Sequence, residues 1–202
     1  CTFEMFMDAC KKEAIKQYPT VYTVSINDAD QLVVTGTYQP MRRTFSLRSS
    51  ENAMQNDILY IPSVIDGKKV VSIEANAFRN NEGIKGVIIA DGINIIGDYA
   101  FAGCVNLEYV IMGSVSEVGE GAFSDCCNLE FVTLPENLLE IKQYTFQNCS
   151  ELKSVTIPES VQRISSSAFE GCYGLSSVHI CNMDSWYNIS FSSYTANPLY
   201  YA

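Results

Sequence analysis

The sequence repeats one apolar phrase five times, with a period of 22 or 23 residues. A phenylalanine lies at the centre of each copy, and an isoleucine or valine precedes it by five positions. A period of this length is typical of a solenoid, in which each repeat buries its apolar face against its neighbours. The repeated phenylalanines are Phe78, Phe101, Phe123, Phe146 and Phe169.

Two periodicities coexist within each repeat. The pattern Ala-Phe-x-x-Cys-x-x-Leu has the spacing of a helix face, so it predicts a short helical or 3-10 turn. The Val-x-apolar step that ends each repeat alternates, so it predicts a short strand. These steps are Val87/Ile89, Val110/Met112, Val132/Leu134, Val155/Ile157 and Val178/Ile180.

The chain divides into four segments. Residues 1–19 carry apolar side chains at helical spacing, which predicts an amphipathic helix that packs on the protein; a membrane-surface helix is the alternative. Residues 20–73 are interpreted as an N-terminal cap and first turn, with two strands around a polar turn at 27–30. Residues 74–181 hold the repeats, and residues 182–202 break the period and are expected to cover the end of the stack.

The segments "IGDYAFAGCVNLEYVIM" (96–112) and "IPESVQRISSSAFEGCYGLSSVHI" (157–180) resemble the leucine-rich repeats of the BspA-like type. The resemblance covers about residues 58 to 181 and implies an α/β fold: a right-handed solenoid with short concave strands, convex turns, and an N-terminal helix and β cap. Such repeats occur mainly in bacterial surface proteins, so the resemblance implies a cell-surface or secreted protein that acts in adhesion or host-protein binding.

The closing segment "WYNISFSSYTANPLYY" (186–201) resembles one that interrupts such arrays before further repeats follow. The end at residue 202 is therefore interpreted as a boundary within a longer array. Cys1 could carry a lipid in an exported lipoprotein, which the sequence alone leaves open.

Charge and composition exclude several function classes. The net charge is −10, and residues 101–202 hold 3 basic and 11 acidic side chains, so their net charge is 3 − 11 = −8. This charge repels phosphate backbones, so no nucleic-acid partner is expected. The apolar runs are too short to cross a bilayer, so no membrane insertion is expected.

No chemistry-bearing motif is found. The single histidine, His179, lies between two inward strand residues and is expected to point to solvent. Glu117 and Glu120 form a carboxylate pair, but they have no partner base. No metal, dinucleotide, phosphate-loop or nucleophile motif is present, so we expect no enzyme, no cofactor and no metal site.

Four cysteines recur at one repeat position: Cys104, Cys126, Cys149 and Cys172. We expect them to form a buried column of reduced thiols that pack as small apolar groups. A disulfide ladder between neighbouring turns is the alternative.

A repeat array without catalytic groups most simply forms a recognition surface. We expect a monomer that binds an extracellular or host protein through outward residues of the concave strands, and the alternative is a structural spacer without a ligand. The apolar candidates could equally be covered by the N-terminal segment or by one another. The candidate binding residues are Ile58, Tyr60, Ile88, Tyr109, Ile111 and Phe131.

Overall fold

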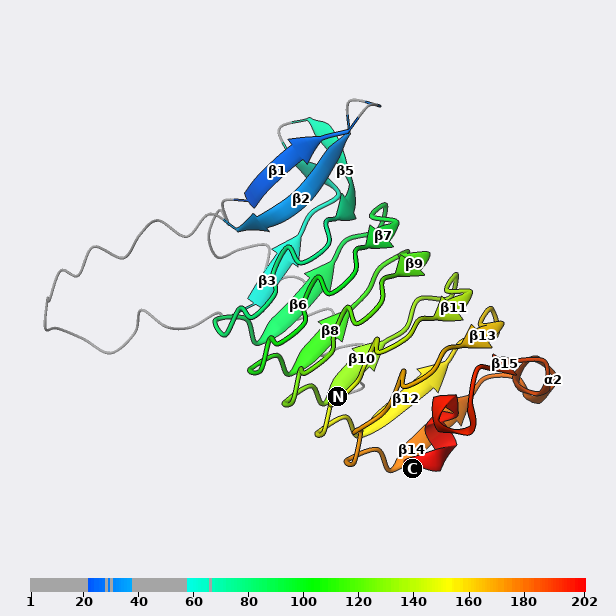
Figure 1. The fold of residues 1–202 in the computed structure, drawn as a ribbon. Helices are drawn as coiled ribbons and strands as arrows, with labels where there is room; N and C mark the ends of the chain where they lie inside the picture. The colour runs from blue at the N-terminus through cyan, green and yellow to red at the C-terminus, as the bar shows by residue number, and fades with distance from the viewer. Residues whose placement is uncertain (1–21, 28, 30, 38–57, 66) are drawn as a thin grey trace, which may run out of the picture.

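The computed structural model describes residues 22–27, 29, 31–37, 58–65 and 67–202. Within them the chain winds through stacked turns from β3 to the C-terminus (Figure 1). The amphipathic helix predicted for residues 1–19 lies outside the described residues.

The Val-x-apolar steps form one parallel sheet, which confirms the predicted strands. We call it the main sheet; its strand order is β14-β12-β10-β8-β6-β3. Neighbouring strands pair in the register of the repeat, with Val87 opposite Val110 and Val110 opposite Val132. The strands are β3 (Ile58–Ile61), β6 (Gly86–Ile89), β8 (Tyr109–Ile111), β10 (Phe131–Thr133), β12 (Ser154–Ile157) and β14 (Ser177–Ile180).

Each turn also contains a second short strand, which the sequence analysis did not predict. These strands contain the apolar residue that precedes each phenylalanine by five positions, such as Ile96 or Ile164. They build the side sheets, in which β5, β7 and β9 are neighbours and β11, β13 and β15 are neighbours. The second strands of the regular turns are the end of β5 (Lys68–Ile73), then β7 (Ile95–Ile96), β9 (Glu117–Val118), β11 (Glu140–Ile141) and β13 (Arg163–Ile164); β15 (Ser190–Phe191) adds a strand from the last segment.

A hairpin extends the first side sheet at its N-terminal end. Strands β1 (Tyr22–Ile26) and β2 (Leu32–Thr37) pair antiparallel, at the two strands predicted around the polar turn. Strand β2 then pairs in parallel with β5 (Lys68–Ile73). Strand β5 also pairs antiparallel with β4 (Val64–Ile65).

The expected helical or 3-10 turns are wrong for residues 74–181, where the structure has successive β-turns instead. Each of these segments places residues in the left-handed region, such as Tyr99 (φ 55°) and Gly103 (φ 71°), and this conformation interrupts a helix. Backbone groups then pair between turns rather than along a helix. The Phe101 N–H, for example, donates to the Ala122 carbonyl oxygen of the next turn (2.8 Å).

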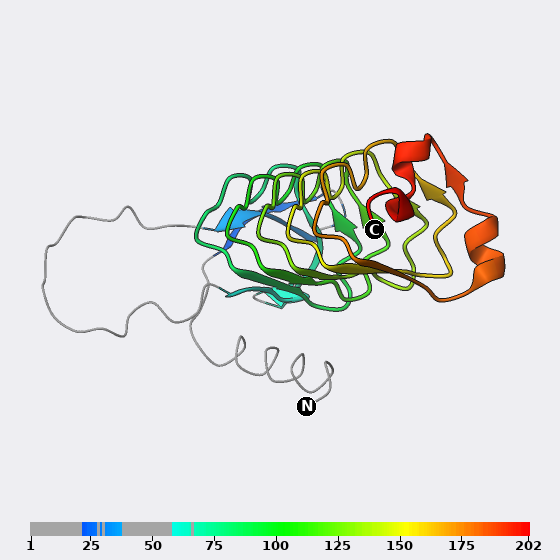
Figure 2. The ribbon, with the colours of Figure 1, turned by 90° about the horizontal axis from the view of Figure 1, so that it is seen from below.

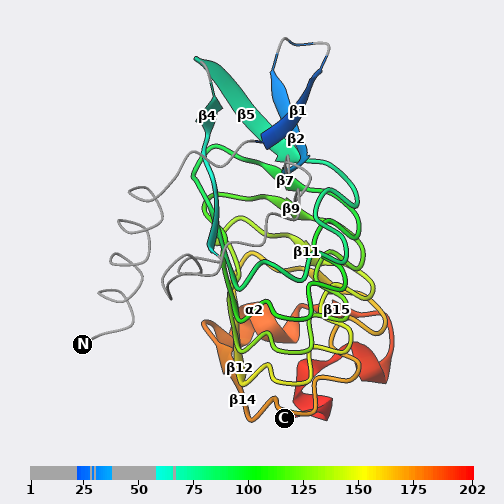
Figure 3. The ribbon, with the colours of Figure 1, turned by 90° about the vertical axis from the view of Figure 1, so that its left-hand side faces the viewer.

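The core is a stack of repeated layers, and Figures 2 and 3 show the turns that enclose it. All five repeated phenylalanines are buried. Adjacent rings stack nearly in parallel; the centroids of Phe123 and Phe146 are 5.7 Å apart with an interplanar angle of 5°. Aromatic pairs stabilise such a core beyond the area that they bury, so the recurrence of the phrase is the recurrence of this layer.

The last segment continues the stack irregularly. Helix α2 (Met183–Tyr187) buries Trp186, and β15 pairs with β13. Two 3-10 helices, η1 (Tyr194–Ala196) and η2 (Pro198–Tyr200), follow. Trp186, Ile189 and Ala196 belong to the same apolar core as the repeats, so residues 182–202 pack on the last regular turn.

Candidate functional site

The N-terminal part of the main sheet is less open than its sequence suggests. Ile88 and Ile111 alternate with core residues and do not belong to the core cluster, yet only 1% and 5% of their surfaces are exposed. Tyr109 is half-buried and its ring lies over Gly86, where an added Cβ atom would come within 2.3 Å of the ring. Ile58 and Tyr60 on β3 are also half-buried. The six candidate residues therefore do not form one continuous exposed patch.

Phe131 is the candidate residue that the structure leaves most open. Its exposed fraction is 43%, and it pairs in register with Tyr109 on one side and Ser154 on the other. The Lys153 ammonium lies 5.5 Å from the centre of the Phe131 ring and also forms an ion pair with Glu130. The aromatic ring at the start of the interior strand β10 thus lies beside a cation that already has a carboxylate partner.

The main sheet opens next to Phe131. Strands β10 and β12 pair only between Phe131 and Ser154, whereas β8 and β10 pair at three positions and β12 and β14 at four. Val132 and Leu134 face the core but are only half-buried, whereas the equivalent Val155 and Ile157 are buried. A separation of the two strands therefore exposes part of the core lining.

A depression of about 320 Å³ lies at this opening. The side chains of Val132 and Leu134 contribute apolar surface, and Thr133 accepts a hydrogen bond from the Met112 N–H (3.2 Å). We call this feature the β10–β12 depression. It is lined by Phe131, Val132, Thr133, Leu134, Ser154, Thr156 and His179.

Sequence reasoning identified Phe131 but not this depression. The spacing from Phe131 to Ser154 is 23 residues, the same as from Ser154 to Ser177, so the period does not indicate where strands separate. The outward position of His179 is confirmed, because its side chain is exposed. The described residues contain no group of three or more His, Cys, Asp or Glu that could hold a metal ion, with or without His179.

The cysteine column is buried, as predicted, and its four thiols are free. Each thiol donates a hydrogen bond to the carbonyl oxygen of the phenylalanine one turn earlier, at 3.1 to 3.2 Å. Burial raises the pKa of the Cys104 thiol to about 11 and that of Cys172 to about 12. Burial also raises the pKa values of Cys126 and Cys149 well above the ordinary range. These thiols are therefore poor nucleophiles and poor metal ligands.

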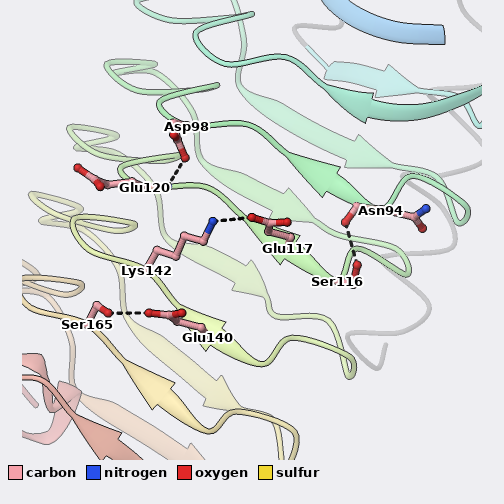
Figure 4. Close-up of polar contacts among 8 residues, drawn as sticks. All are labelled: Asn94, Asp98, Ser116, Glu117, Glu120, Glu140, Lys142 and Ser165. Carbon is pink, nitrogen blue, oxygen red and sulfur yellow. Dashed lines mark hydrogen bonds and ion pairs between the residues drawn. The ribbon is translucent and has the colours of Figure 1, made fainter. Parts of the chain in front are cut away.

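Acidic side chains in or just after the side-sheet strands form hydrogen bonds and an ion pair between neighbouring turns (Figure 4). Asp98 accepts a hydrogen bond from the Glu120 N–H (2.8 Å), and Glu140 accepts one from the Ser165 hydroxyl (2.8 Å).

The carboxylate pair considered in the sequence belongs to the same contacts. Glu117 pairs with Lys142 at 2.5 Å, and Glu120 accepts a hydrogen bond from the Tyr99 hydroxyl (2.8 Å). This bond raises the pKa of Tyr99. The two carboxylates thus have structural partners, and their contacts give no support to acid–base catalysis.

Another depression, of about 570 Å³ and open to solvent, lies on the side sheet of β11, β13 and β15, with Gln162 and Arg163 in its lining.

Within the described part of the chain, no helix is both long and apolar enough to cross a membrane.

The fold is a leucine-rich repeat solenoid, as defined by its parallel strands, the backbone hydrogen bonds between successive turns and the stacked phenylalanines. The family model of the BspA type leucine rich repeat region, in six copies, matches residues 71–197. The chain therefore belongs to the BspA-type leucine-rich repeat family.

Several solved bacterial structures have a similar fold. The T. pallidum leucine rich repeat protein TpLRR is 21% identical with a TM-score of 0.67, covering 89% of this chain and 90% of that one. A leucine rich cell surface protein from Faecalibacterium prausnitzii is 25% identical with a TM-score of 0.59, covering 81% and 43%. The pneumococcal vaccine antigen PcpA is 20% identical with a TM-score of 0.56, covering 81% and 49%.

The chain thus spans about half the length of the last two proteins. A search of curated proteins gave no match.

Proposed function

We propose that this chain is a non-catalytic, cell-surface or secreted module that binds an extracellular or host protein through the exposed part of its main sheet. The observation that carries the proposal is the character of that face. From β8 to β14 its outward residues include aromatic, hydroxyl and imidazole side chains but no carboxylate, although residues 101–202 have a net charge of −8. Depletion of charge with retention of aromatic residues is typical of the centre of a protein interface.

The family supports this location and role. BspA-type repeats and a Faecalibacterium neighbour described as a cell surface protein favour surface exposure. A stacked solenoid also presents its outward residues at fixed spacing, because each turn is held by its neighbours. A rigid surface loses little conformational entropy when it binds a partner.

Within the proposed surface, Phe131 is the central contact and Tyr109 extends it. Ile58, Tyr60, Ile88 and Ile111 remain part of the proposal only as support for that surface, because the structure buries or half-buries them.

Binding to an immobilised panel of extracellular host proteins tests the proposal. The wild-type chain should bind at least one member, and Phe131→Ser should weaken that binding. Tyr173→Ser is the matched control, because Tyr173 is 83% exposed and does not lie on the main sheet. Absence of binding across the panel would favour the alternative, a structural spacer, and equal loss in both variants would remove the main sheet as the site.

A further inference from the structure

We propose that the open depression on the side sheet of β11, β13 and β15 binds a saccharide whose sugar ring carries one carboxylate. This inference goes beyond the proposed function, because the site lies on a different sheet and the ligand belongs to a different class. The depression has a volume of about 570 Å³, and we call it the side-sheet depression. It is lined by Leu139, Glu140, Gln162, Arg163, Asn188 and Ser190.

The parallel strands place the lining residues in a fixed array. Glu140 lies opposite Arg163, and Arg163 lies opposite Ser190, so these three residues form one row across the sheet. Neighbouring strands are about 4.8 Å apart, which makes the row about 10 Å wide. The Ser190 N–H donates to the Gln162 carbonyl oxygen (2.9 Å), so the backbone of β15 is held beside that of β13. A sugar ring in the depression therefore contacts side chains from more than one strand.

Arg163 supplies the cation of the site. Residues 101–202, all of which the structure describes, contain three basic side chains, and two of them form ion pairs: Lys142 with Glu117 and Lys153 with Glu130. Arg163 is exposed and forms no ion pair within the described residues. Its guanidinium is thus available to an anion from outside the chain. The planar guanidinium group matches a carboxylate, because it can donate two parallel hydrogen bonds to the two oxygens.

The carboxylate next to Arg163 has a different partner. Glu140 accepts a hydrogen bond from the Ser165 hydroxyl through one of its two oxygens (2.8 Å; Figure 4). The other oxygen has the capacity to accept a hydroxyl group of a ligand. The charge of Glu140 and the net charge of −8 on residues 101–202 repel a polyanion. The site is therefore suited to one carboxylate among hydroxyl groups and not to a chain of carboxylates.

The rest of the lining favours a sugar over a peptide. Gln162 and Asn188 carry amide groups, each with a donor and an acceptor, and Ser190 carries a hydroxyl. Leu139 is the one apolar residue of the lining and is 55% exposed, so it offers a small contact for the C–H face of a sugar ring. An acidic peptide side chain would satisfy Arg163 alone, whereas a sugar acid would satisfy Arg163 and the neutral polar groups together.

The test is a titration of the ¹⁵N-labelled wild-type chain of residues 1–202 with two probes that carry the carboxylate on different sugars. The probes are the methyl glycosides of glucuronic acid and of N-acetylneuraminic acid. At least one of them should shift the amide resonances of the lining residues more than those of the main sheet, and the probe that binds identifies the source of the carboxylate. The methyl ester of that sugar keeps its hydroxyl groups but lacks the charge, so it should bind at least about ten-fold more weakly.

Substitutions of the exposed Arg163 test its role. Arg163→Gln should weaken binding of the sugar acid at least about ten-fold, and Arg163→Lys should recover little of the loss, because an ammonium group cannot form the two parallel bonds. Lys153→Gln is the control, because it removes the same charge beside β12 and outside the lining. It should change affinity less than about two-fold. An equal loss in Lys153→Gln and Arg163→Gln would show a response to overall charge alone and would overturn the inference.

Results with the unaltered chain also decide the question. No shift with either probe, equal binding of the methyl ester, or shifts confined to residues outside the lining would overturn the inference. N-acetyl-glutamate amide carries a carboxylate without hydroxyl groups. If it binds at the lining as tightly as the sugar acid, the site belongs to an acidic peptide side chain and the assignment of a saccharide fails.

This inference and the proposed function fail separately. Arg163→Gln should leave binding to a host protein unchanged, and Phe131→Ser should leave binding of the sugar acid unchanged. If a host protein binds while neither sugar acid does, the proposed function stands and this inference fails. If a sugar acid binds at the lining while no host protein binds, this inference stands and the proposed function fails.

Discussion

The Cys149 thiol donates a hydrogen bond to the backbone carbonyl oxygen of Phe123, one turn earlier in the stack, with an Sγ–O distance of 3.2 Å. The same bond recurs in the turns around it, so the cysteine does more than fill space. It satisfies a buried carbonyl group and connects two consecutive layers of the core. A side chain such as valine would fill the volume but would supply no donor.

The four column cysteines should not react with a thiol reagent in the native state. Cys104, Cys126, Cys149 and Cys172 are fully buried and their pKa values are raised, whereas Cys127 and Cys181 are exposed. Peptide mass spectrometry after native labelling should find the reagent on the last two and miss the first four. Labelling in denaturant should reach all of them, and a peptide linking Cys126 to Cys149 would contradict the prediction.

Truncation of one stacked ring should strongly destabilise the solenoid. Phe146 is fully buried between the rings of Phe123 and Phe169. Phe146→Ala should therefore lower the free energy of unfolding by about 3–5 kcal/mol, as other large-to-small core substitutions do. Denaturant melts measure this loss. Tyr173→Ala, at an exposed position, should stay within about 0.5 kcal/mol of the wild type; a loss below about 1 kcal/mol for Phe146→Ala would show that the layer is not essential.

Stability should fall at alkaline pH because of the buried thiols. Their pKa values in the folded state are raised, to about 11 for Cys104 and about 12 for Cys172, from an ordinary value near 9. Between these values the unfolded chain has lost protons that the folded chain still holds, so the stability present below pH 9 declines as pH rises toward the folded pKa. Unfolding free energies measured from pH 8 to 10.5 should fall less steeply for Cys172→Ala than for the wild type. Parallel slopes would contradict this assignment.

One repeat-junction glycine should be intolerant of any side chain. A Cβ atom at Gly119 would lie 2.5 Å from the backbone nitrogen of Asp98 in the preceding turn. Gly119→Ala should therefore cost about 2 kcal/mol or more, because the two turns must move apart. Gly83→Ala is the control, since its nearest atom is the side-chain oxygen of Asn81 at 3.3 Å. Similar melting curves for the two variants would show that the turns can separate freely.

The sequence predicts the layers better than it predicts how the backbone connects them. The alternation at Val110 and Val132 was sufficient to predict the strands of the main sheet, because alternating apolar residues in so short a segment indicate a strand. The spacing of Phe101 and Cys104 indicated a helix, yet a chain of β-turns buries residues at the same intervals. Only the left-handed conformations distinguish the two, and residues such as Tyr99 and Tyr144 give little sequence signal for them.

The candidate site was predictable only in part, for a similar reason. Alternation correctly placed Phe131 and His179 on the outer face. It could not show that Ile88 and Ile111 on the same face would be buried, because alternation predicts the face of the sheet on which a side chain lies and not whether other residues cover that side chain. Nor could it locate the separation of β10 from β12, which leaves the repeat period unchanged.

The last prediction concerns the contribution of Phe131 to binding. Aromatic side chains bury a large area at low entropic cost, and a few such residues dominate most interfaces. Phe131→Ser should therefore weaken binding to a host-protein partner by about 2 kcal/mol or more, while thermal melts show a stability change within about 1 kcal/mol because the ring is 43% exposed.

The variant Lys153→Met distinguishes the contribution of the Phe131 ring to binding from that of the neighbouring lysine charge. It removes the charge that lies 5.5 Å from the Phe131 ring centre but keeps a long apolar side chain. Because the proposed contact is apolar, this variant should retain most of the affinity in surface plasmon resonance. A loss as large as that of Phe131→Ser would mean that the partner recognises the lysine charge, and unfolding of Phe131→Ser would mean that the ring belongs to the core.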